Sequence, residues 1–400
     1  MLKKRVLVNR SQTSSTMNEP LTSPESSSSP SPSSSPMMTN PKPKEYTWTE
    51  LQAIEAKRRN ILERAELPYW RILTYMEGTC LKALSSDWLL WFTMSVFCAI
   101  RLQAWTSGML PEFARELGRM NIDVIGGFLS FFLVLFVNQA NGRFQDMYKE
   151  SMNACKRIYD VAGNVTTALP PHQARRMVRY LNAAHAAGYV GLGQAYSKKH
   201  FFQNINAKYA LLTVSEANLL NDSVDMDAGP EACHQLVEWC MKDVDSAYEA
   251  KLLEVKDFVN IREKLLAMRS SIDTLYDYAD QPIHFFYIHF LILLSTLYLP
   301  LFAASNAYKA GAGDTMHWSA DVLSGLIVAL QCIFVIGLRM LGRKMVDPYG
   351  DDYEDLSVLR YVQTAWKRSQ LILDTKFPGA VEPQTEDKLQ SQHQEASRRF

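Results

Sequence analysis

Four long apolar windows constrain this chain more than any other feature of its sequence. They cover residues 88–100, 124–142, 281–308 and 322–338. A helix needs about 20 predominantly apolar residues to cross a bilayer. One such window would fit a helix buried in a large soluble core, but four windows with aromatic edges and basic flanks favour membrane spans. We therefore predict spans at about 88–105, 122–142, 282–305 and 321–341.

The distribution of basic residues predicts an orientation for these spans. Four spans place both ends of the chain on the same side of a membrane. The segment after the last window carries Arg339, Arg343 and Lys344. In contrast, Arg115 and Arg119, in the connection between the first and second spans, are offset by acidic residues. Because basic residues favour the cytosolic side, we expect both termini in the cytosol, together with the region 143–280.

The remaining parts of the chain differ in composition. Residues 21–36 contain nine serines and four prolines, so the arm 1–45 is expected to be disordered. Residues 143–280 have mixed charge and apolar residues at helical spacing, which predicts a helical domain continuous with the second and third spans, with Ser215 as a candidate helix cap. A flexible polar tail is expected at 376–400. Residues 46–375 are thus predicted to form an all-α, multi-span membrane protein with a cytosolic helical domain.

Composition excludes several classes of function. The chain has 42 basic and 42 acidic residues, and this zero net charge argues against a general nucleic-acid partner. No GxSxG, Walker A, GxGxxG or HExxH motif is present, so no enzymatic activity is predicted. The six cysteines form no CxxC pair, and His284 and His289 are better interpreted as packing residues than as metal ligands.

The second window carries two neighbouring stripes of side chains. Residues four apart share a helix face, so Phe128, Phe132 and Phe136 form one stripe. The other stripe consists of Gly127, Phe131 and Leu135. Aromatic rings present a positive edge to an anion, and a narrow apolar constriction can gate a pore by dewetting. The adjacent Gly126 and Gly127 allow close helix approach, which favours a position inside a bundle.

Four stretches of the chain resemble the bestrophin family of anion channels. They are WRILTYMEGTCLKALSSDW (70–88), VNQANGRF (137–144), YDYADQPIHFFYIHF (276–290) and LQCIFVIGLRMLGRKMVDPYGDDYEDL (330–356). The second stretch matches at Asn138 and Arg143, with Phe144 where the family usually has tryptophan. The last stretch, which matches without a gap, is the most specific, and the resemblance covers roughly 67–375.

The resemblance implies a homopentamer in a lipid bilayer, with the second span lining one central pore. It implies passive conduction of chloride and similar small anions, with no required cofactor. Anchoring on Asn138 and Arg143 places a hydrophobic neck at Gly127, Phe131 and Leu135. The stripe of Phe128, Phe132 and Phe136 is the alternate register.

Two charged residues, Asp123 and Arg143, are predicted at the pore mouths. Gly127 and Asp123 depart from the family's pattern, and a ring of Asp123 carboxylates would attract cations instead of anions.

The acidic stretch DPYGDDYEDL (347–356) allows two interpretations. Animal members of the family bind calcium with this loop, and the matching ligands here are Asp352 and Asp355, with Asp347 in place of an asparagine. Lys344 replaces an upstream glutamine, and its ammonium group disfavours a cation there. In the alternative, the loop is structural: Asp347-Pro348-Tyr349-Gly350 makes a turn, and the loop carboxylates pair with basic residues of a neighbouring helix.

A second function remains open at this stage, a non-conducting or calcium-responsive regulatory or scaffold protein of the same fold. The sequence also allows more than one location: the plasma membrane is favoured, and an organelle membrane, thylakoid or endomembrane, is the alternative.

Overall fold

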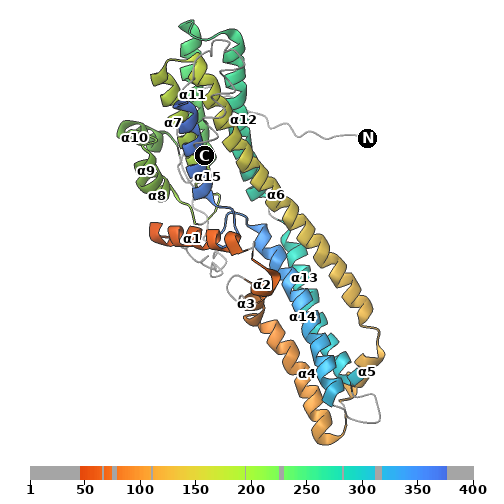
Figure 1. Ribbon diagram of the computed structural model, residues 1–400. Coiled ribbons are helices and arrows are strands. Elements are labelled where there is room, and N and C mark those ends of the chain that lie inside the picture. Colours follow the sequence, from red (N-terminus) through yellow and green to blue (C-terminus); the bar gives the residue numbers. More distant parts are fainter. Residues whose placement is uncertain are drawn as a thin grey trace, which may run out of the picture. The chain divides into compact units, whose positions relative to one another are not determined.

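The computed structural model is built of helices joined by turns and loops in the residues that it describes (Figure 1). These are 46–64, 67–73, 79–109, 111–193, 195–224, 229–281, 283–310 and 318–375. Within these ranges there is no β-strand, and one isolated bridge joins Val190 to Gly193. The all-α prediction is therefore confirmed. The predicted arm 1–45 and tail 376–400, and Pro282 of the matched motif, lie outside the described residues.

The helices follow one another along the chain with short connections. The first six are α1 (Trp48–Arg64), α2 (Tyr69–Leu73), α3 (Cys80–Ser85), α4 (Trp88–Ser107), α5 (Glu112–Arg119) and α6 (Asp123–Ala168). Next come α7 (Pro171–Ala187), α8 (Lys198–His200), the π-helix η1 (Phe201–Asn206), α9 (Ala207–Tyr209), α10 (Val214–Ser223) and α11 (Gly229–Glu249). The last four are α12 (Val255–Asp280), α13 (Phe285–Ala310), α14 (Trp318–Val346) and α15 (Val358–Leu373).

Four of these helices, α4, α6, α13 and α14, are long and apolar enough to cross a membrane. They fall on the four predicted windows. Local chemistry sets their ends: the Asp87 carboxylate accepts a hydrogen bond from the backbone N–H of Leu89 at 2.9 Å and caps α4. Gly108, with φ of 66°, ends the same helix in the left-handed conformation that glycine adopts without strain.

Helix α6 extends far beyond the predicted span 122–142. It has 46 residues, so it is about 70 Å long at 1.5 Å per residue. No proline interrupts it, and it ends where Pro170 and Pro171 follow Leu169. Pro171 then occupies the first turn of α7, where its missing N–H costs nothing. The pore helix of the resemblance is thus continuous with the polar region that follows it.

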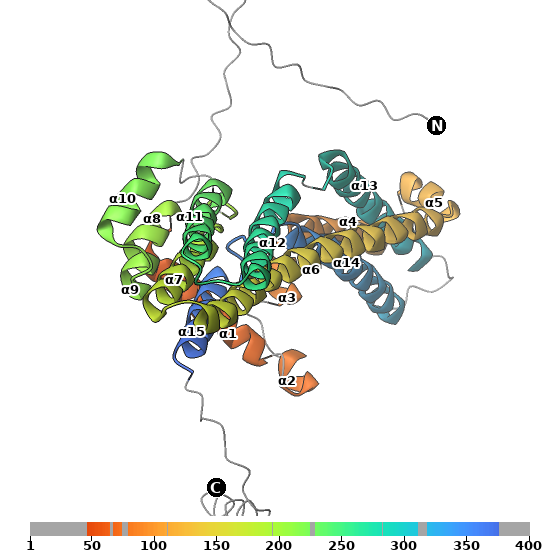
Figure 2. The same ribbon diagram turned by 90° about the horizontal axis from the view of Figure 1, so that it is seen from above.

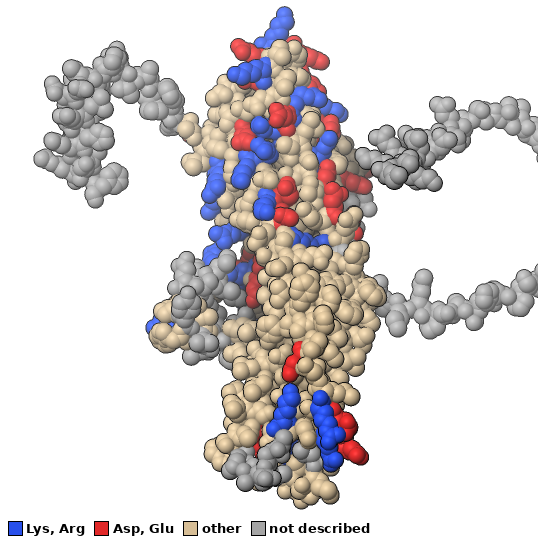
Figure 3. Space-filling model, turned by 90° about the vertical axis from the view of Figure 1, so that its right-hand side faces the viewer, with Lys and Arg blue, Asp and Glu red and all other residues tan. Residues whose placement is uncertain are grey.

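The first half of α6 packs with α4, α5, α13 and α14 around one hydrophobic cluster, here called the span bundle. Buried members include Leu129 and Leu133 of α6, Leu299 of α13 and Val335 of α14. Figure 3 shows a broad belt without Lys, Arg, Asp or Glu on the face over this part of the molecule, with charged residues above and below it. An uncharged belt is the surface that hydrocarbon requires.

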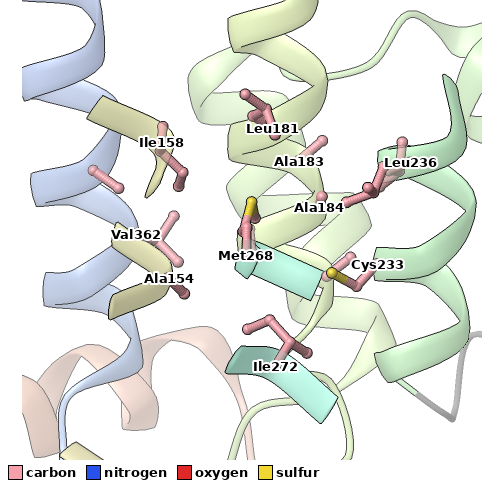
Figure 4. Close-up of a cluster of buried hydrophobic side chains, with 14 of the residues drawn as sticks. Ala154, Ile158, Leu181, Ala183, Ala184, Cys233, Leu236, Met268, Ile272 and Val362 are labelled. Carbon is pink, nitrogen blue, oxygen red and sulfur yellow. The ribbon is translucent and has the colours of Figure 1, made fainter. Parts of the chain in front are cut away.

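The second half of α6 packs with α7, α11, α12 and α15 around a separate cluster, here called the second bundle. Figure 2 shows α12 next to α6, in agreement with the extensive contact between the two helices. Small side chains such as Ala154, Ala183 and Ala184 let the helices approach, and larger ones such as Leu236 and Met268 fill the space between them (Figure 4). Burying one such large side chain contributes about 2 kcal/mol.

A buried ion pair holds the span bundle together near one end. Arg101 of α4 is 4% exposed and pairs with Asp321 of α14. The same guanidinium donates to the carbonyl oxygen of Ala307 in α13 at 3.2 Å, and the indole of Trp105 donates to Asp321 at 2.7 Å. The arginine inside this predicted span therefore has partners from two neighbouring helices, α13 and α14.

Replacing Asp321 with asparagine is expected to destabilise the protein strongly, because Arg101 would stay buried without a counter-charge. The expected loss is about 3 kcal/mol. The midpoint of thermal unfolding of the purified protein measures it. Glu116→Gln, which disrupts the exposed Arg119–Glu116 pair, is the control and is expected to change stability by less than about 1 kcal/mol. Equal midpoints for the two variants would contradict this account.

The helix cap predicted at Ser215 lies two residues earlier. Thr213 caps α10 in a capping box with Glu216, whose carboxylate accepts from the Thr213 N–H at 2.7 Å. Arg179 of α7 donates to both Glu216 oxygens, at 2.6 and 2.9 Å, and the Tyr180 hydroxyl donates at 2.5 Å. Burial alone would raise the pKa of Glu216, but these hydrogen bonds outweigh it and lower the pKa to about 2.

This shift predicts a pH-dependent contribution to stability. Because the folded-state pKa lies below the ordinary value of 4.5, the contribution is complete above about pH 4.5 and is lost as the pH falls toward 2. Glu216→Gln is expected to lower the thermal midpoint at pH 7, with the difference from wild type shrinking below pH 4.5. Glu263→Gln, at a 72% exposed side chain, is the control. A difference that stayed constant down to pH 3 would contradict the assignment.

Candidate functional site

One side of the first half of α6 is fixed in the span bundle. Leu129, Leu133 and Phe136 are at most 2% exposed. The Phe136 ring lies over Gly342 of α14, where a Cβ atom would come within 2.3 Å of the ring. Tyr287 of α13 meets Phe136 edge-on at 5.9 Å, and its hydroxyl donates to the carbonyl oxygen of Phe132 at 2.8 Å. These contacts set the rotation of α6 about its own axis.

The opposite side of α6 is open in the single chain. Phe131 is 59% exposed and Leu135 is 43% exposed, while a Cβ atom at the exposed Gly127 would meet nothing within 4 Å. Two residues along a helix correspond to a rotation of about 200°, so Phe131 points almost directly away from Leu129 and Leu133. The stripe of Gly127, Phe131 and Leu135 therefore lies along the uncovered face.

The alternate stripe passes from the surface into the core. Phe128 is 61% exposed, but Phe132 is partly buried against Phe290 of α13, with ring centroids 5.8 Å apart and the planes at 90°. Phe136, at 2% exposed, lies wholly in the span bundle. The structure thus does not bring the three phenylalanines together on one exposed face.

The two predicted mouth residues have different surroundings. The Asp123 side chain is 63% exposed, and the Lys309 ammonium at the end of α13 lies 3.6 Å from its carboxylate. Arg143 donates to the carbonyl oxygen of Gln281 at 2.6 Å, which ties α6 to the end of α12. Between these two residues α6 carries no charged side chain. Lys309, which follows the third apolar window directly in the sequence, is a partner that sequence reasoning missed.

The acidic loop after α14 is a compact turn attached to α6. The Leu356 N–H donates to the carbonyl oxygen of Pro348 at 2.8 Å, and the Asp352 N–H donates to the Asp355 carboxylate at 2.7 Å. Tyr349 is 4% exposed, and its hydroxyl pairs with that of Ser151 in α6. The turn predicted at Asp347-Pro348-Tyr349-Gly350 is present, and its own backbone closes it.

Arg58 of α1 enters this loop. It is 6% exposed and donates to the carbonyl oxygens of Gly350 and Asp352, both at 3.0 Å. Its guanidinium also lies 3.8 Å from the Asp355 carboxylate and 3.0 Å from Glu55. Sequence reasoning missed Arg58, because it precedes the matched stretches and is separated from the loop by almost 300 residues.

The described Asp and Glu side chains of the loop do not form a group of three that could hold a metal ion. Across the described part of the chain, no three His, Cys, Asp or Glu side chains are grouped so that they could hold a metal ion. Burial raises the pKa of Asp355 to about 7, and Arg58 occupies two carbonyl oxygens of the kind that calcium uses. Asp347 and Asp352 are exposed, and Lys344 lies 3.3 Å from Glu354.

The fold and the open face of α6 define a helical membrane protein with an uncharged, partly aromatic helix face. A family model described as "Bestrophin, RFP-TM, chloride channel" matches residues 59–375. The chain therefore belongs to the bestrophin family, as the sequence motifs predicted. No curated protein matches the chain.

Solved structures show the same fold. A bacterial bestrophin homologue from Klebsiella pneumoniae, solved by zinc phasing, has a TM-score of 0.58 at 14% identity, covering 72% of this chain and 98% of its own. A variant of that homologue has the same TM-score and coverage at 15% identity. A structure described only as a membrane protein gives a TM-score of 0.59 at 13% identity, again covering 72% and 98%.

Proposed function

We propose that this protein is a passive anion channel that conducts chloride through a pore lined by α6. The observation that carries this proposal is the open, uncharged face of α6, with Phe131 at its centre and a fully packed core on the opposite side. Membership of a family described as chloride channels supports the same conclusion.

The channel needs several copies of the chain, because one span bundle leaves the α6 face uncovered and cannot surround an ion. We take the number five from the family resemblance. In such a ring each chain contributes one copy of Gly127, Phe131 and Leu135 to the neck. The burial of Phe136 and the partial burial of Phe132 favour this register over the alternate one.

The chemistry of the neck suits a weakly hydrated anion. Its side chains offer no carboxylate to a cation, and aromatic ring edges present a partial positive charge to an anion. Water leaves a narrow apolar constriction easily, which provides a gate. Lys309 beside Asp123 offsets the negative charge that would otherwise favour cations at that mouth.

We also propose that both termini and the second bundle lie in the cytosol. The basic residues after α14 support this orientation, because they lie on the same side of the predicted spans as the termini. The plasma membrane is the favoured location, with an organelle membrane as the alternative.

Chloride efflux from liposomes tests the proposed function. Vesicles that contain the purified protein and potassium chloride are diluted into a chloride-free medium, and valinomycin provides a path for potassium. We expect rapid chloride release that depends on the protein. Intact oligomers that release no chloride would contradict conduction and would instead support the non-conducting scaffold of the same fold.

A further inference from the structure

We propose that the Arg58 guanidinium acts as a built-in cation in the acidic loop, so that this loop is clasped to α1 without bound calcium. The inference goes beyond conduction, because it concerns how the acidic loop is held in place and whether the loop needs calcium. It also decides between the two interpretations that the sequence of the loop allows.

The first step is the position of the charge. Arg58 reaches Gly350 and Asp352 through separate nitrogens, Nη2 and Nε, each 3.0 Å from a carbonyl oxygen. The carboxylate of Asp355 lies 3.8 Å from the same guanidinium group. Carbonyl and carboxylate oxygens around one positive centre are the surroundings that a calcium ion also requires. Arg58 as a whole is 6% exposed, so its side chain is buried among these oxygens and does not lie on the surface.

The second step is the chemistry of arginine. Its guanidinium remains charged at all physiological pH values and presents donors in a rigid planar fork. Such a fork satisfies two carbonyl oxygens at once, which a lysine ammonium on a flexible stem does less well. Bringing a second cation to the same oxygens would cost these hydrogen bonds and place two positive charges close together.

Further contacts on either side of Arg58 join α1, and Tyr46 just before it, to the loop and to Ser357 just after it. The Tyr46 hydroxyl donates to Asp351, and Lys57 donates to the Tyr353 hydroxyl at 3.2 Å. Glu55 accepts hydrogen bonds from both Arg58 and the Ser357 hydroxyl. The loop is thus closed on the α1 side by a set of contacts with Arg58 at their centre.

The clasp also reaches the proposed pore helix. Tyr349 pairs with Ser151 and donates to the carbonyl oxygen of Met147, and both partners belong to α6. A continuous series of contacts therefore runs from α1 through the loop to α6. Because Arg58 cannot dissociate as an ion does, this series stays closed when the calcium concentration changes.

The test compares thermal unfolding of the purified full-length protein in about 1 mM calcium and in excess chelator. We expect the same midpoint for the wild type in both conditions. Arg58→Ala and Arg58→Gln should lower the midpoint by several degrees, and Arg58→Lys should lower it less. Arg59→Ala is the matched control, since Arg59 is an exposed neighbour on α1.

A second comparison separates a cation substitute from an ordinary structural contact. Calcium should recover part of the loss in Arg58→Ala, where the loop oxygens become free, and should leave Arg59→Ala unchanged. Three results would overturn the proposal: a calcium-dependent rise in the wild-type midpoint, Arg58 variants that match Arg59→Ala, or no calcium recovery in Arg58→Ala. The wild-type comparison needs no variant, so it decides even if the variants fail to fold.

Discussion

Replacing Phe131 with alanine is expected to raise the chloride conductance of reconstituted channels about tenfold, which corresponds to about 1.4 kcal/mol of barrier. The change removes one ring from each chain at the centre of the open α6 face, where Phe131 is 59% exposed. A wider and less apolar constriction retains water more easily, so the barrier for a partly hydrated ion falls. Single-channel recording in symmetric potassium chloride measures the effect.

Phe128→Ala is the matched control for this prediction. Phe128 is a phenylalanine of the same helix with similar exposure, 61%, but it lies about 60° around the helix from Phe131. Its replacement should change the conductance much less. Unchanged currents in Phe131→Ala, together with a large effect of Phe128→Ala, would contradict the proposed neck.

Replacing Gly193 with alanine is expected to destabilise the fold strongly. A Cβ atom there would lie 2.0 Å from the carbonyl oxygen of Tyr349, so the backbone of the acidic loop would have to move. Tyr349 has little freedom to move, since it is 4% exposed and bonded to α6. We expect a loss of about 3 kcal/mol, seen as a lower thermal midpoint and a lower yield of oligomer.

Gly163→Ala provides a control of opposite sign. Gly163 lies inside α6, and a Cβ atom there would meet nothing within 4 Å. Alanine is the better helix former, so this variant should be more stable by about 0.5–1 kcal/mol. Equal stability of Gly193→Ala and Gly163→Ala would contradict the close contact described between the 190–193 turn and the acidic loop.

The four spans and the family were predictable from the sequence, because apolar composition alone selects a helix that crosses hydrocarbon. A helical domain at 143–280, continuous with the second and third spans, was also predicted, but the bounds of its helices were not. The residues after Gly142 are as polar as those of many loops. Their helical state depends on packing against α12 and α15. The cap of α10 was misplaced at Ser215 because Thr213 and Ser215 both carry hydroxyl groups that can cap a helix. The capping box between Thr213 and Glu216 shows that Thr213 is the cap.

The candidate site was predictable only in part. Periodicity identified both stripes on the second span, but it could not show which of them is exposed. Burial against α13 and α14 distinguishes the two stripes, and this burial depends on contacts such as that of Phe136 with Gly342. The Arg58 contacts could not be predicted, because nothing local in the sequence of α1 indicates that it contacts a loop almost 300 residues away. Long-range pairs of this kind follow from the fold, and not from a pattern of neighbouring residues.

The reversal potential across a planar bilayer tests the proposed conduction most directly. The purified protein is placed in asymmetric potassium chloride, and the measurement is repeated with calcium and with a chelator. The account predicts a reversal near the chloride equilibrium potential in both conditions. A reversal near the potassium equilibrium potential would contradict it and would indicate that Asp123 selects cations despite the neighbouring Lys309.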